Sequence, residues 1–162
     1  MHEILAERAT GFSVPHVVTP AMERGLEYED EMFDKFVELT GRDVKLSRLY
    51  EHPEISLFKA TPDRELDDGL MEGKIPSIEK FIGWKLAGVV PEEHKPQMLA
   101  QMACTGRKWV GFIAYCPEIK DERRNLFLAK YVPEPEEIGR VEAHAIRFLK
   151  EVEAMWEQFT TA

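Results

Sequence analysis

The segment Trp109–Cys116 (WVGFIAYC) is a nearly continuous run of apolar residues in which aromatic and β-branched side chains dominate. Such a run is typical of a strand that is covered on both faces, because a strand with one face in water alternates polar and apolar residues. We therefore predict that this segment lies inside a β-sheet.

The rest of the chain alternates between helical and extended patterns. The predicted helices are residues 3–10, 20–40, 77–86, 92–105 and 133–159, and the predicted strands are residues 44–50, 55–60, 70–75, 109–116 and 125–132. The three consecutive strands before residue 76 are joined by short turns and predict an antiparallel meander. The apolar stripe of the last helix predicts core packing along its length. We expect an α/β (α+β) fold, a mixed central β-sheet flanked by α-helices, as a single domain over residues 1–162.

Two carboxylates and an ammonium group are expected to converge in the stretch 60–76 (ATPDRELDDGLMEGKIP). Asp63 follows a predicted strand, and Glu72 and Lys74 lie two residues apart in the next strand. Alternate residues of a strand share a face, so Glu72 and Lys74 point the same way. A hairpin across residues 67–69 would bring Asp63 beside that pair.

This arrangement suits metal-assisted hydrolysis. Carboxylate oxygens bind Mg²⁺ or Mn²⁺, a bound metal lowers the pKa of its water, and a nearby lysine can orient or deprotonate that water. The alternative is a plain hairpin with a polar turn and a surface Glu–Lys pair, because short motifs of this kind often occur without function.

Further polar residues lie on two of the predicted helices. Glu29 falls on the apolar face that Met22, Leu26, Phe33, Phe36 and Val37 form, where an unpaired carboxylate is costly; alternatively it lies at the rim and reaches water. Gln97 and Gln101 are four residues apart and therefore share one face of their helix.

Composition restricts the possible environment and partners. The 162 residues carry a formal net charge of −9, which argues against a nucleic-acid partner, although metal ions would cover part of the negative charge in a metal nuclease. Cys104 and Cys116 show no zinc spacing and are expected to be reduced, buried thiols. The five histidines show no ligand spacing either. No membrane span and no signal peptide are expected.

Taken together, these motifs resemble the phage lambda-type exonucleases, which belong to the YqaJ-like viral recombinase group of the PD-(D/E)XK nuclease superfamily. The resemblance rests on RGLEYEDEMFDKF around Glu29, ATPD ending at Asp63, MEGK with Glu72 and Lys74, PQMLAQM with its two glutamines, and TGRKWVGFIAYCPE. It covers nearly the whole chain and implies a restriction-endonuclease-like core.

The resemblance also implies roles for individual residues. Glu29, Asp63, Glu72 and the backbone carbonyl of Gly73 would bind the catalytic metal, which would be Mg²⁺, replaceable by Mn²⁺, with two ions in each site. Lys74 would position or activate water and Gln97 would border the site. The DNA-binding residues would be Ser77, Lys80 and Gln101. IPSIEKF departs from the family pattern by placing Ile75 where Cys is common.

The function implied is a 5′→3′ exonuclease of double-stranded DNA in phage or prophage recombination. It would leave 3′ overhangs for a single-strand annealing protein, form a ring-shaped homotrimer and act in the bacterial cytoplasm. DNA-facing cations would include Lys80, Lys85, Arg107 and Lys108. The alternatives are an endonuclease on the same fold and a catalytically silent DNA-binding remnant. The family's N-terminal segment, which helps to bind the 5′-phosphate, has no counterpart in MHEILAERATGFS.

Overall fold

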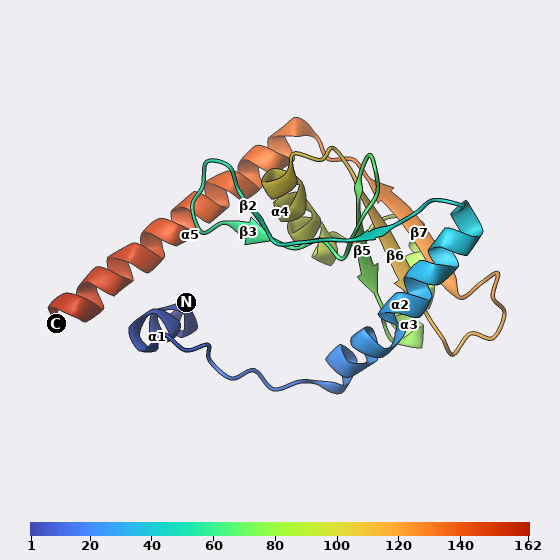
Figure 1. The fold of residues 1–162 in the computed structure, drawn as a ribbon, viewed down its shortest axis with the longest axis horizontal. Helices are drawn as coiled ribbons and strands as arrows, with labels where there is room; N and C mark the ends of the chain where they lie inside the picture. The colour runs from blue at the N-terminus through green and yellow to red at the C-terminus, as the bar shows by residue number, and fades with distance from the viewer.

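The computed structural model describes residues 1–162 and contains a mixed five-stranded sheet with helices on both faces (Figure 1). The helices are α1 (His2–Thr10), α2 (Pro20–Thr40), α3 (Ile78–Ala87), α4 (Lys95–Thr105), α5 (Pro135–Thr161) and a short 3-10 helix, η1 (Glu92–His94). The strands are β1 (Lys45–Leu46), β2 (Tyr50–Glu51), β3 (Lys59–Ala60), β4 (Arg64–Glu65), β5 (Leu70–Lys74), β6 (Val110–Tyr115) and β7 (Leu126–Tyr131). The sheet order is β1, β4, β5, β6, β7, and β2 and β3 form a separate ribbon.

The predicted internal strand is confirmed as β6, which is buried along its whole length. It pairs in parallel with β5 and antiparallel with β7, so the sheet is mixed as expected. Phe112 and Ala114 pack with residues of α3 and α4, while Ile113 and Tyr115 pack with α2. This alternation follows from the two-residue period of a strand. The apolar run therefore supplies both layers of the core.

The predicted meander is wrong. The expected strand 44–50 divides into β1, which pairs with β4, and β2, which pairs with β3. The expected strand 55–60 is mostly a turn, because the Nδ1 atom of His52 accepts hydrogen bonds from the backbone N–H groups of Glu54 and Ile55. Such side-chain bonds compete with a strand ladder. A hairpin across residues 67–69 is present as predicted, but its first strand is β4 and not the predicted strand 55–60, whose last residues form β3 and pair with β2.

The helices begin and end close to the predicted positions, but two of them pack less than expected. In α2, Met32, Phe33 and Phe36 are buried, whereas Met22 and Leu26 are exposed because the first turns of the helix extend beyond the sheet. In α5, Val152 is the only buried residue, so the apolar stripe is not core along its length. Figure 1 shows α5 running out past the sheet to the C-terminus.

Both cysteines are free and buried, as predicted. None of the helices combines the length and the apolar character that crossing a membrane requires.

Candidate active site

The hairpin of β4 and β5 brings the two predicted carboxylates together. Asp63 lies just before β4, and its Oδ2 atom accepts a hydrogen bond of 2.7 Å from the backbone N–H of Gly73 in β5. The neighbouring Glu72 is completely buried. Burial and, secondly, the negative charge of Glu72 raise the pKa of Asp63 to about 6. The pair therefore concentrates negative charge in a place poorly screened by water.

Both oxygens of the Glu72 carboxylate have partners in the site. The Nζ atom of Lys74 donates to Oε1 of Glu72, and it lies 3.4 Å from Oε1 of Gln97. The Nε2 atom of Gln101 donates to Oε2 of Glu72 over 2.5 Å. Glu72 and Lys74 thus share a face of β5, as strand alternation predicts, and the two glutamines reach the same place from one face of α4.

Gln101 is expected to be important for stability, which a surface glutamine would not be. Leucine at this position would leave Oε2 of the buried Glu72 without its donor, and a buried polar group without a partner costs about 1–3 kcal/mol. We expect Gln101→Leu to lower the free energy of unfolding by that amount. The exposed Gln97 offers the matched control, because Gln97→Leu should change it by no more than about 0.5 kcal/mol. Equal effects of the two substitutions in urea denaturation would contradict this assignment.

Arg64 is a member of the site that the sequence analysis missed. Its guanidinium group donates to Oε1 of Glu29 over 2.6 Å, to Oδ1 of Asp30 over 2.7 Å and to the carbonyl of Asp63 over 2.8 Å. The side chain is 9% exposed and lies over the ring of Phe33. Arg64 is thus the partner that a carboxylate on the apolar face of α2 requires. The only signal in the sequence was the position of Arg64 directly after Asp63, in a segment for which no strand was predicted.

Two carboxylates of the site fit a divalent cation. The carboxylate oxygens of Asp63 and Glu72 are ligands that Mg²⁺ and Mn²⁺ prefer. A cation would also relieve the repulsion by Glu72 that, after burial, raises the pKa of Asp63. Glu29 is held by Arg64, and no group of three or more His, Cys, Asp or Glu side chains has an arrangement that could hold a metal ion. Asp63 and Glu72 therefore fit a cation as a pair, while Glu29 lies outside that pair in this structure.

A cleft of about 740 Å³ opens over this cluster. Its lining contains eight of the predicted site residues: Glu29, Asp63, Glu72, Gly73, Lys74, Ser77, Lys80 and Gln97. Gln101 does not line the cleft and contacts Glu72 from behind it. Ser77 caps the N-terminus of α3, and Lys80 is exposed one turn later. A helix N-terminus with a nearby lysine is suited to an anion such as a phosphate.

The other predicted DNA-facing cations lie outside the lining of the cleft. Lys85 donates to the backbone carbonyls of Arg124 and Leu126, and Arg107 donates to the carbonyl of Asp67. These contacts give Lys85 and Arg107 structural roles. Lys108 is exposed and makes no hydrogen bond or ion pair.

Two aromatic side chains of the cleft were also missed. His94 of η1 stacks on Phe112 and meets the edge of Trp84, and its Nε2 atom is buried without a hydrogen-bond partner. Burial, followed by the charge of Lys74, lowers the pKa of His94. The imidazole of His94 is therefore uncharged at pH 7 and lines the cleft as an aromatic side chain. No spacing pattern in the sequence indicated His94, because the residues that it contacts come from α3 and β6.

Comparison with known proteins shows the family to which this chain is similar. Residues 2–108 match the family model described as the YqaJ-like viral recombinase domain. No curated protein matches the chain.

Solved structures extend the similarity to the whole chain. The alkaline exonuclease LHK-Exo from Laribacter hongkongensis is 32% identical, with a TM-score of 0.91, and the match covers 99% of this chain and 81% of that one. The structure of LHK-Exo in complex with dAMP matches with a TM-score of 0.92, at the same identity and coverage. A phage-related exonuclease from Haemophilus somnus 129PT, 12% identical with a TM-score of 0.71 and coverage of 99% and 80%, shares the fold.

Proposed function

Because the chain belongs to the YqaJ-like viral recombinase family, we propose that it is a metal-dependent exonuclease that degrades double-stranded DNA in the 5′→3′ direction and leaves 3′ overhangs. The observation that carries the proposal is the convergence of Asp63, Glu72 and Lys74 in one cleft. The 32% identity to an alkaline exonuclease over 99% of the chain supports the reaction class.

Each residue of the cleft would have a distinct role in hydrolysis. Asp63 and Glu72 would hold the cation, with the Gly73 carbonyl as a further ligand. Glu29 would join them only by leaving its ion pair with Arg64. When bound, Mg²⁺ or Mn²⁺, as one ion or two, would lower the pKa of water and neutralise charge on the phosphate. The Nζ atom of Lys74, which contacts Glu72 and Gln97, would orient the attacking water. Gln101 keeps Glu72 in position by holding its second oxygen.

DNA would enter along the side of the cleft that Ser77 and Lys80 form. The first-turn N–H groups of α3 and the ammonium group of Lys80 would contact the phosphate backbone. Since the chain has a net charge of −9, a single copy should hold DNA weakly. We propose a homotrimeric ring that retains DNA by enclosing it, works with a single-strand annealing protein, and acts in the cytoplasm of a bacterial host.

The proposal is tested by comparing linear and covalently closed duplexes of the same sequence in millimolar Mg²⁺. Linear DNA with a 5′-phosphate should be degraded, the same DNA without the phosphate more slowly, and closed circles not at all. EDTA and the Glu72→Gln variant serve as controls and should both stop the reaction. Light scattering should show a trimer.

Other outcomes would contradict this reading. Closed circles cut as fast as linear DNA, by a protein that remains monomeric, would identify an endonuclease. Degradation that is unaffected by EDTA would remove the metal from the proposal. DNA binding without any cleavage would identify a silent DNA-binding protein.

A further inference from the structure

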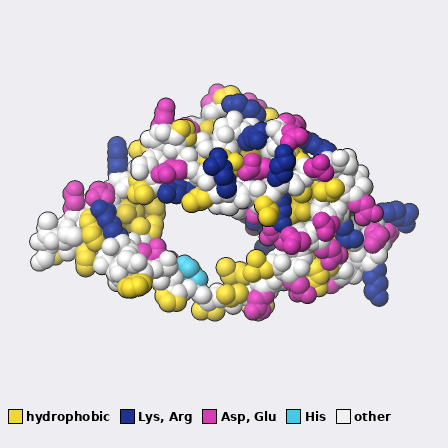
Figure 2. All heavy atoms as spheres, in the orientation of Figure 1, with side chains coloured by type: hydrophobic (Ala, Val, Ile, Leu, Met, Phe, Trp, Pro, Cys, Tyr) yellow, Lys and Arg dark blue, Asp and Glu magenta, His cyan; other side chains and the backbone are white.

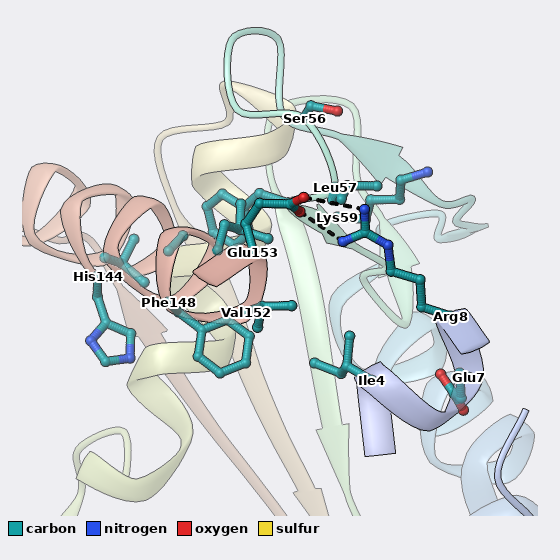
Figure 3. Close-up of a pocket in the computed structure, with 14 residues that line it drawn as sticks. Ile4, Glu7, Arg8, Ser56, Leu57, Lys59, His144, Phe148, Val152 and Glu153 are labelled. Atoms are coloured by element: carbon teal, nitrogen blue, oxygen red, sulfur yellow. Dashed lines mark hydrogen bonds and ion pairs between the residues drawn. The ribbon is translucent and has the colours of Figure 1, made fainter. Parts of the chain in front are cut away.

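A second large hollow shares no lining residue with the cleft of the acidic cluster and is mostly apolar. It measures about 1010 Å³ and is bounded by α1, the middle of α5 and residues 56–59. Figure 3 shows Ile4 of α1 pointing toward Val152 and Phe148 of α5, with Leu57 on the facing turn. We call this hollow the α5 groove. None of the predicted catalytic, metal-binding or DNA-binding residues lines it.

Helix α1 is attached to the α5 groove by a few specific contacts. The guanidinium group of Arg8 makes an ion pair of 2.7 Å with Glu153 and lies 4.4 Å from the centre of the Trp156 ring. The apolar contact comes from Ile4, which remains 41% exposed. No residue of α1 is buried. The helix therefore covers the groove without filling it.

The linker that follows α1 does not attach it to the body of the protein. The hydrogen bonds of residues 11–19 are made only with α1 and with the first turn of α2. Figure 2 shows an opening through the molecule between this linker and the body. Phe12 and Val17 are 78% and 85% exposed. Apolar side chains so exposed in a linker have no partner within this copy of the chain.

The α5 groove can accept the α1 helix of another copy as well as that of its own chain. Every contact of α1 with the groove comes from α5 or residues 56–59, and an identical copy offers the same Glu153, Trp156 and Val152. The linker, which could span about 30 Å when extended, allows α1 to leave its own body without unfolding anything else. Exchange of an identical element between copies is a low-cost route to an oligomer, because no new contact has to evolve.

We propose that α1 and its linker form an arm that docks in the α5 groove of a second copy of this chain. Exchange would preserve the Arg8–Glu153 ion pair and would carry the exposed apolar residues of the linker across to the neighbouring molecule. The inference does not depend on the nuclease proposal, since it uses none of the residues of the cleft.

The test uses cysteine pairs that can form only between chains. One chain carries Ile4→Cys and another, with a tag of different size, carries Val152→Cys; the two are co-expressed, purified together, mildly oxidised and separated without reductant. An exchanged arm gives a disulfide-linked product containing both chains. The parent chain, whose two cysteines are buried, is the background control. The double variant in a single chain shows whether these positions can cross-link at all.

The Arg8–Glu153 ion pair provides a second experiment. Arg8→Glu added to the Ile4→Cys chain should lower the yield of the mixed product several-fold, and Glu153→Arg in the Val152→Cys chain should restore it. Circular dichroism of each variant verifies that the fold is intact. A double variant that cross-links only within one chain, with no mixed product, would overturn the proposal. So would a folded double variant that does not cross-link at all, because α1 would then not occupy the groove.

Discussion

Replacing Lys74 with alanine is expected to slow the hydrolysis of linear DNA by about 100-fold or more, the range typical of a group that orients or deprotonates the attacking water. The substitution removes the ammonium group beside Glu72 and Gln97 and leaves Asp63 and Glu72 in place. DNA binding should persist, so the loss should lie in kcat and not in KM. Single-turnover kinetics with a gel-shift assay separate the two quantities.

Lys120→Ala is the matched control for this variant. Lys120 is an exposed lysine with no ion pair and no place in the cleft, so its removal changes the net charge by the same amount. We expect unchanged kinetics for this control. If the affinity of Lys74→Ala for DNA fell as far as its rate, Lys74 would be a phosphate-binding residue and not a group acting on water.

Asp63→Asn is expected to abolish cleavage while making the metal-free protein more stable. The asparagine keeps an oxygen that can accept from the N–H of Gly73 but removes a charge that burial and Glu72 disfavour. The pKa of about 6, against a reference of 3.8, corresponds to a penalty on the order of 2–3 kcal/mol when Asp63 is ionised. Urea denaturation at pH 8 in EDTA should show a gain of up to that size.

The pH dependence of this gain follows from the sign of the shift. The pKa of Asp63 is higher in the folded protein than in the unfolded chain, so the folded state favours the protonated form. The parent protein therefore loses stability relative to Asp63→Asn as the pH rises from about 4 to about 6, and the difference stays constant above that range. A difference that grew as the pH fell would contradict the assignment.

Added metal should reverse the order of the two proteins. A cation that binds only the folded state raises stability by mass action, so millimolar Mn²⁺ should raise the Tm of the parent and change that of Asp63→Asn much less. This readout requires no DNA. An equal response of both proteins, or none in the parent, would remove Asp63 from the metal site.

The parts of the structure that the sequence predicted correctly depend on short-range periodicity. The unbroken apolar run of β6 required cover on both faces, and the spacing of Glu72 and Lys74 in β5 required a common face. The four-residue spacing of Gln97 and Gln101 likewise brought both to the same site. Each of these inferences needs only the geometry of one element, which its own residues determine.

The tertiary structure alone decided which distant groups meet. Arg64 and Glu29 are separated by 35 positions, and their ion pair depends on how α2 crosses the hairpin. Most of the strand predicted at 55–60 is replaced by a turn whose backbone N–H groups donate to His52. The apolar stripes of α2 and α5 are exposed where the helices run past the sheet. Periodicity shows which residues share a face but not whether another element lies opposite that face, because burial is a property of the assembled chain.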